Sequence, residues 1–211
     1  MRLYTYFRST AAYRVRIALD LKGIDYEAVS VHLLRDGGEH KHAAFLARNP
    51  QGFVPVLDDG RTLVTQSLAI IEYLDARYPE PRLLPADPVV RARVQALALL
   101  IACDTHPLNN LRVLQYLRNE LSLEEPAVKR WIRHWIAESF RAFESTVDSN
   151  GRYCIGSCVS LADVCLVPQL FNARRFDCDL TPYPTLVRIA DHLGTLPAFL
   201  RAAPSNQPDA E

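Results

Sequence analysis

The chain has 211 residues, of which 49% are hydrophobic and 23% charged, and its 24 basic and 24 acidic side chains balance to a formal net charge of zero. This composition is typical of a globular protein with one large domain or two modest ones, and without a basic excess or a long apolar run it favours neither a nucleic-acid-binding protein nor a membrane protein. Five cysteines, an odd number, and an N-terminus without a secretory signal favour a reducing cytoplasm.

In chain order, the first predicted elements are a strand and a helix. Residues 2–7 are rich in aromatic side chains and have the character of a short strand. After Ser9 and Thr10, both good N-cap residues, no Gly or Pro interrupts the chain until Gly23. Because a helix N-terminus has unpaired N–H groups and a positive dipole end, this junction is either an ordinary cap or a place that binds an anion.

The following elements complete a small mixed α/β domain over residues 1–78. A turn at Asp58-Asp59-Gly60 predicts a hairpin, and Gln66-Ser67 opens a helix with an apolar stripe. The predicted strands are residues 26–31, 53–57 and 62–64, and the predicted helices are residues 39–47 and 66–78. The order βαβαββα predicts one four-stranded mixed sheet.

Prolines punctuate residues 79–87, which predicts a linker. Asp87 and Pro88 then have the pattern of an N-cap followed by the first helical position, and residues 88–211 show no convincing strand. The expected helical segments are residues 89–119 broken at Pro107, 126–148, 160–173 opened by a capping box of Ser160 and Asp163, 186–193, and 196–202. The polar residues 204–211 are expected to form a loose tail.

This layout resembles that of the cytosolic glutathione transferases, and three short motifs carry the resemblance. Val54-Pro55 resembles their cis-proline site, Gln66-Ser67 their γ-glutamyl site, and Ser160 with Asp163 the capping box of their sixth helix. More narrowly, the segments that resemble the zeta class are residues 8–9, 14–19, 22–26, 66–74 and 179–184.

The resemblance implies a thioredoxin-like N-terminal domain followed by an all-α C-terminal domain, with glutathione as cofactor, in a cytoplasmic homodimer. Zeta-class enzymes are cis–trans isomerases of maleylacetoacetate or maleylpyruvate, and the similarity is greatest to the bacterial enzymes that act on maleylpyruvate in gentisate catabolism. We therefore expect an isomerase for a small dicarboxylate, with no nucleic-acid or membrane partner. The alternatives are a maleylacetoacetate isomerase, a general conjugating transferase, or a scaffold domain without chemistry.

Ser9 corresponds to the residue that activates the thiol of glutathione in this class. Where the class usually has Ser-Ser-Cys-Ser, residues 9–12 are Ser-Thr-Ala-Ala, which disfavours a mechanism that needs a protein thiol. A thiol with a pKa of about 8.5 needs roughly 2.7 kcal/mol to become mostly ionised at pH 7. A helix N-terminus supplies about 0.3–1 kcal/mol, at best about 2 kcal/mol, and a hydrogen bond to a charged group roughly 1.5–3 kcal/mol. Neither is clearly enough alone, but the Ser9 hydroxyl and the helix N-terminus together are.

The resemblance also implies the remaining site residues. Contacts to glutathione are implied at Ser9, Thr10, Ala11, His40, Val54, Pro55, Gln66, Ser67, Asp104, His106 and Asn110. Gln66-Ser67 is also the pattern of an ordinary N-cap, but Val54-Pro55 one hairpin upstream favours binding. Asp104 could equally cap the broken helix around Pro107. His40 with His42 is more typical of a solvated loop than of a metal pair. We expect no metal site.

The substrate would bring two carboxylates, which arginine is suited to bind in a bidentate manner. Arg8 adjoins Ser9, and Arg175 follows the helix that Asp163 caps, so both are candidates for catalysis and substrate binding together with Ser9. Arg112 is a third candidate for substrate binding. For each arginine taken alone, a solvated surface role is the alternative.

Overall fold

The computed structural model describes every residue from Met1 to Glu211. The chain forms two compact units, one made of Met1–Leu83 with Thr195–Glu211 and the other of Leu84–Gly194. The division falls within the proline-rich segment. The final segment of the chain, which the sequence placed with the helical domain, groups instead with the first unit.

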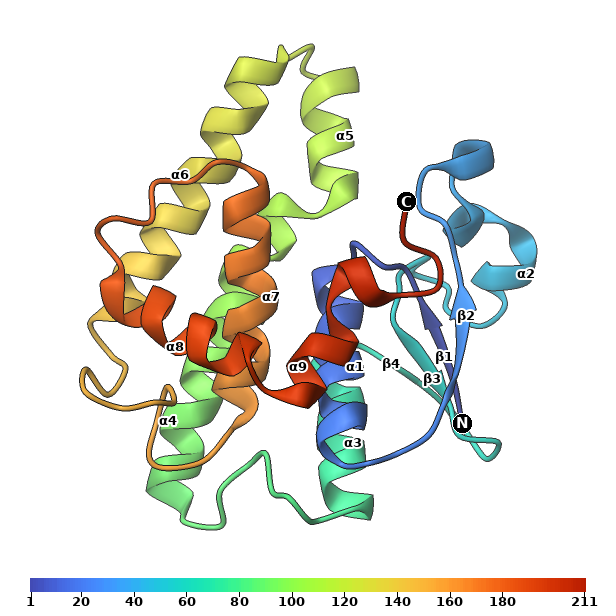
Figure 1. Ribbon diagram of the computed structural model, residues 1–211. Coiled ribbons are helices and arrows are strands. Elements are labelled where there is room, and N and C mark those ends of the chain that lie inside the picture. Colours follow the sequence, from blue (N-terminus) through green and yellow to red (C-terminus); the bar gives the residue numbers. More distant parts are fainter. The chain divides into compact units, whose positions relative to one another are not determined.

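A four-stranded sheet in the order β2-β1-β3-β4 is the centre of the first unit (Figure 1). Its strands are β1 (Arg2–Thr5), β2 (Glu27–Ser30), β3 (Val56–Asp58) and β4 (Leu63–Thr65). Leu3 of β1 lies opposite Ala28 in the parallel pairing with β2 and opposite Leu57 in the antiparallel pairing with β3. Because a parallel pair needs a crossover connection, the chain passes through α1 (Thr10–Leu21) between β1 and β2.

Helices cover both faces of this sheet. The helices α1 and α3 (Ser67–Arg77) lie on one face and α2 (Ala43–Leu46) on the other (Figure 1). Tyr4 and Val56 pack with Phe45 of α2. Successive side chains of a strand point to opposite faces, so the fully buried Leu3 and Leu57 point toward α1 and α3.

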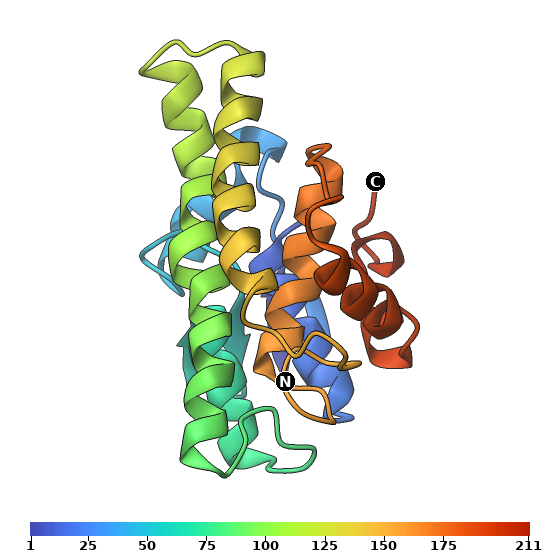
Figure 2. The same ribbon diagram turned by 90° about the vertical axis from the view of Figure 1, so that its left-hand side faces the viewer.

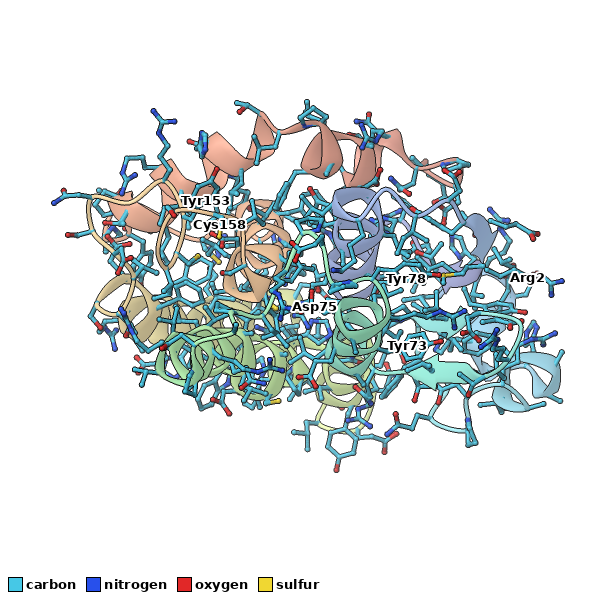
Figure 3. The ribbon with its side chains drawn as sticks, turned by 90° about the horizontal axis from the view of Figure 1, so that it is seen from below. Arg2, Tyr73, Asp75, Tyr78, Tyr153 and Cys158 are labelled. Atoms are coloured by element: carbon cyan, nitrogen blue, oxygen red, sulfur yellow. The ribbon has the colours of Figure 1, made fainter.

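Polar contacts join α3 to its neighbours in this unit. Asp59 in the β3–β4 turn accepts two backbone N–H groups of the turn and the hydroxyl of Tyr73, and lies 2.6 Å from Nη1 of Arg77. Tyr73 lies beside the strands in Figure 3. Between these two residues of α3, Asp75 has a carboxylate oxygen 2.8 Å from Nζ of Lys22. These contacts fix the β3–β4 turn and the end of α1 against one helix.

The last helix, α9 (Pro197–Ala202), packs beside α1 in the same unit (Figure 1). Nε of the buried Arg16 donates to the Ala202 carbonyl at 3.0 Å, and the Tyr13 hydroxyl donates to the Phe199 carbonyl at 3.4 Å. These two bonds explain why the end of the chain belongs with its beginning.

The expectation of a loose tail is wrong. After a 3₁₀ turn over Pro204–Asn206, Asp209 accepts hydrogen bonds from the Phe7 N–H at 3.1 Å and the Ser30 hydroxyl at 3.2 Å. Glu211 pairs with the guanidinium groups of Arg8 and Arg35 and lies 3.0 Å from Nε2 of His32, all in the same unit. The polar side chains of the tail are ordered by polar partners, and these partners lie far away in the sequence.

The second unit is helical throughout. Its α-helices are α4 (Pro88–Leu99), α5 (Leu111–Asn119), α6 (Glu125–Glu144), α7 (Leu161–Arg175) and α8 (Pro184–Gly194). Between α4 and α5 lie a π-helical turn (Leu100–Thr105) and a 3₁₀ turn (Pro107–Asn109), so the predicted break at Pro107 is confirmed. This interrupted run lies beside α6 (Figure 2).

The predicted helix starts of this unit are confirmed where local caps define them. Asp87 accepts the N–H groups of Val89 and Val90 at 3.0 and 2.8 Å. At the start of α7, the buried Asp163 accepts the N–H groups of Ser160 and Cys154, each at 2.8 Å. Burial raises the pKa of Asp163 even though these hydrogen bonds oppose the shift. No helix combines the length and the apolar character needed to span a membrane.

Candidate active site

Ser9 caps α1, as its sequence position predicts. Its backbone is extended, with φ −69° and ψ 114°, and its hydroxyl oxygen accepts the Ala12 N–H at 3.2 Å. A hydroxyl oxygen that accepts one bond still has its own hydrogen to donate. The cap and the proposed thiol donor are therefore compatible in one side chain, which is half-buried beside the buried Thr10 and the half-buried Ala11.

The buried side chain of Arg16 forms hydrogen bonds with the segment before Ser9. Its Nη1 lies 3.1 Å from the Thr5 hydroxyl and 3.3 Å from the Tyr6 carbonyl, and its Nη2 donates to the Phe7 carbonyl at 3.0 Å. Burial lowers the pKa of Arg16 to about 10. The sequence alone assigns no role to Arg16, although its position between Val15 and Ile17 is a signal that it is buried and bonded.

Gln66 occupies an unusual backbone conformation at the start of α3. Its φ is +68° with ψ 120°, although it is not glycine, and its side chain makes no cap. A residue held in such a region costs about 1–3 kcal/mol, and such residues cluster at ligand sites. Its Nε2 donates to Oε1 of Gln51 at 2.8 Å, a partner that the sequence did not suggest.

Ser67, the first residue of α3, is buried and accepts a hydrogen bond from Nη1 of Arg14 at 3.3 Å. Arg14 lies on α1 and is itself 1% exposed. Its positive charge therefore adds to the positive end of the α3 dipole. The N-terminus of α3 is consequently a favourable place for a carboxylate.

The Val54–Pro55 peptide bond is cis, which confirms what the resemblance implies. The ladder between β1 and β3 reaches only to Val56. Val54 thus lies just beyond the paired part of the sheet, where an extended peptide can add as a further strand.

His40 is buried, which corrects the expectation of a solvated loop at this position. The predicted helix over 39–47 is divided at His42 into a 3₁₀ turn (Glu39–Lys41) and α2. Burial lowers the pKa of His40, and the charges of Lys41 and His42 lower it further. A Cβ on Gly38 would lie 2.5 Å from Cε1 of His40, so this close approach requires glycine.

The candidates of the second unit lie on the α4–α5 connection. Asp104 is exposed in the π-helical turn, and His106 precedes the 3₁₀ turn. Asn110 is the N-cap of α5, and its side chain accepts the Arg112 N–H at 3.2 Å. The alternative that Asp104 caps the broken helix is therefore wrong, because Asn110 does so.

The three candidate arginines have different surroundings. The guanidinium of Arg8 lies over the Phe7 ring, 4.7 Å from its centroid, and pairs with Glu211 at 3.3 Å. Arg175, at the end of α7, is exposed, and its guanidinium lies 5.0 Å from the centroid of the Phe176 ring. Arg112 is exposed on α5.

The first unit thus joins features that suit a peptide-like anion. It has the N-termini of α1 and α3, the Ser9 hydroxyl that can donate, and the buried Arg14. It also has a backbone position at Val54 that lies beyond the paired part of the sheet. This combination can bind an extended peptide with a free carboxylate and stabilise a negative charge near Ser9.

Comparison with known proteins gives consistent matches. Residues 3–82 match the family model "Glutathione S-transferase, N-terminal domain". A protein of Vibrio cholerae, described as a probable maleylacetoacetate isomerase, is 56% identical over 99% of this chain and 97% of its own.

Solved structures agree with these matches. The holo structure of maleyl pyruvate isomerase, described as a bacterial zeta-class glutathione S-transferase, is 49% identical with a TM-score of 0.97 and covers 100% of both chains. A maleylacetoacetate isomerase from Anaeromyxobacter dehalogenans, solved with bound dicarboxyethyl glutathione and citrate in the active site, is 44% identical with a TM-score of 0.87 and covers 100% of this chain and 97% of its own.

Proposed function

The chain belongs to the zeta class of the glutathione S-transferases, and from this membership we propose that it catalyses the glutathione-dependent cis–trans isomerisation of maleylpyruvate to fumarylpyruvate. The observation that carries the proposal is the Ser9 hydroxyl at the N-terminus of α1, placed in the same unit as the strained start of α3. The first provides for a thiolate and the second for the γ-glutamyl carboxylate.

The residues of the first unit fit glutathione. Gln66 is held at φ +68°, which local propensity does not favour, and the buried Arg14 adds positive charge beside Ser67. Val54, Gln66 and Ser67 would hold the peptide, with His40 near its glycyl end by resemblance. When bound, glutathione supplies a thiol that adds reversibly to the cis double bond of the substrate, so that this bond can rotate before the thiol is released unchanged.

The chain's own residues have two tasks in this reaction. Ser9 donates its hydroxyl hydrogen to the sulfur and, with the α1 N-terminus, favours the ionised thiol. Arg8 and Arg175, with Arg112 as a further candidate, bind the carboxylates of the substrate, which must stay bound during rotation. The Anaeromyxobacter relative supports this assignment, because its ligand is a glutathione that carries a dicarboxyethyl group. Asp104, His106 and Asn110 are proposed as further glutathione contacts by resemblance alone.

Two other enzyme activities are alternatives to maleylpyruvate isomerisation. The 56% identical relative from Vibrio cholerae favours maleylacetoacetate as the substrate. Relative values of kcat/KM for the two keto acids decide between them, and formation of stable glutathione conjugates would indicate a general transferase instead. We further propose that the protein is a cytoplasmic homodimer that serves gentisate catabolism.

The carboxylate assignment is tested by Arg8→Ala and Arg175→Ala. Each should lower kcat/KM for maleylpyruvate by about 100-fold, on the order of 3 kcal/mol, because a hydrogen bond to a charged group is lost. Glutathione affinity, measured by calorimetry, should stay near the wild-type value. Near wild-type turnover in both variants would contradict the assignment.

A thermal-shift measurement separates the enzyme from a scaffold. Glutathione at 100 times its Kd should add about 2.7 kcal/mol to the free energy of unfolding. No shift at millimolar glutathione would favour a domain that has kept the fold and lost the cofactor.

A further inference from the structure

Three side chains of the first unit converge on the side chain of Glu211. Nε2 of His32 lies 3.0 Å and Nη2 of Arg35 lies 3.2 Å from one carboxylate oxygen, and Nη2 of Arg8 lies 3.3 Å from the other. Both oxygens are therefore engaged, and two of the three donors are arginines, the side chain best suited to carboxylates. We call Arg8, His32 and Arg35 the carboxylate cluster.

The ring of His32 is fixed in a donating orientation. Its Nδ1 accepts the backbone N–H groups of Leu34 at 3.1 Å and Arg35 at 2.7 Å. Because Nδ1 accepts, the hydrogen of the neutral ring lies on Nε2, the atom that faces Glu211. The ring is buried and packs edge-to-face on Tyr6, with 5.0 Å between centroids. The His32 ring is thus held by its own surroundings and does not depend on Glu211 for its orientation.

The side chain of Glu211 contacts only this cluster, whereas the tail itself is anchored two residues earlier, at Asp209. Asp209 bonds the Phe7 N–H and the Ser30 hydroxyl, so the tail stays attached when Glu211 moves. The side chain of Glu211 is 46% exposed and that of Arg35 is 60% exposed. Ion pairs of this exposure are weak, and a carboxylate from solution can replace one.

We propose that the carboxylate cluster is a subsite of the active centre, that Glu211 fills it in the free protein, and that one carboxylate of the maleyl substrate displaces Glu211 on binding. This inference rests on the proposed function, because Arg8 adjoins Ser9, the proposed thiol donor. Glu211 is then an internal competitor with the same chemistry as the substrate. Its presence weakens substrate binding relative to the cluster alone.

Glu211→Gln tests the competition. We expect KM for maleylpyruvate to fall about two- to fivefold, the range that corresponds to an exposed ion pair, while glutathione affinity and the unfolding temperature stay unchanged. The matched control is Glu138→Gln, which removes the same charge from an exposed pair with Arg141 in the second unit and should leave KM unchanged. An unchanged or raised KM in Glu211→Gln overturns the competition, as does a changed glutathione affinity.

A binding measurement with succinate gives a result that does not depend on turnover. Succinate has two carboxylates and no double bond to react, and calorimetry should show tighter binding to the glutathione-loaded Glu211→Gln protein than to wild type. Adding Arg35→Gln to that variant should weaken succinate binding again, and equal binding to all three proteins overturns the subsite. If wild-type protein isomerises neither keto acid, the proposed function has failed. Normal turnover with unchanged succinate binding in the variants overturns the subsite alone.

Discussion

Replacing Ser9 removes two interactions of one hydroxyl, and their sizes follow from the structure. In Ser9→Ala, α1 loses the bond to the Ala12 N–H, which costs about 1 kcal/mol of the free energy of unfolding. Bound glutathione loses a donor to its charged sulfur, which is worth roughly 1.5–3 kcal/mol. Since 1.36 kcal/mol corresponds to one pKa unit, the pKa of the bound thiol should rise by about 1–2 units.

Ser9→Gly separates the two effects. Glycine at an N-cap costs only a few tenths of a kcal/mol relative to serine, and the backbone angles of Ser9 are open to glycine. Both variants should therefore raise the thiol pKa equally. Only Ser9→Ala should also lower the free energy of unfolding, by about 1 kcal/mol in a urea titration.

Thiolate absorbance of bound glutathione, followed against pH in the three proteins, measures the pKa directly. Isomerase activity at pH 7 should fall by roughly an order of magnitude in both variants and recover toward high pH, because the thiol then ionises without help. Equal midpoints in wild type and Ser9→Gly would refute the reasoning. Ser9 would then be a cap only, and ionisation would depend on Thr10 or the helix N-terminus.

Three further predictions concern binding, acid stability and assembly. Gln66→Ala and Ser67→Ala should weaken glutathione binding in calorimetry while the circular dichroism stays native; wild-type affinity in Ser67→Ala would leave that residue a structural role only. The hydrogen bond from Tyr73 and the turn's backbone N–H groups lower the pKa of Asp59, so its contribution to stability is present above about pH 4 and is lost as the pH falls toward the lowered value. Asp59→Asn should flatten this part of the curve of unfolding free energy against pH, and an unchanged slope would contradict the assignment. Light scattering should give twice the chain mass of 23.8 kDa, whereas a monomer at micromolar concentration would exclude the homodimer.

The elements that the sequence predicted well are those with local causes. The extended backbone at Ser9 begins α1, and Gly23, with φ +61°, follows its end. At Asp87 the N-cap bonds are made to residues two and three positions later. Such signals lie within a few residues of the structure they determine, and the zeta-class resemblance added the cis bond at Pro55.

The features that the sequence did not predict depend on distant partners. Glu211 contacts the His32 ring, and nothing in the composition of the tail predicts this partner. Gln66 adopts a positive φ that its own propensity disfavours, so the surrounding structure must impose it. His40 is buried by contacts that its neighbours in the chain do not reveal.

The packing of α9 on α1 also has a consequence for how the protein is made. The first unit consists of two pieces of chain separated by the whole of the second unit. During synthesis, Arg16 is therefore buried only after the residues that carry its last acceptor, the Ala202 carbonyl, have emerged. A gene fragment cut at the proline-rich segment encodes the complete sheet but leaves this guanidinium one partner short. Residues 1–83, produced alone, are consequently a poor substitute for the complete first unit.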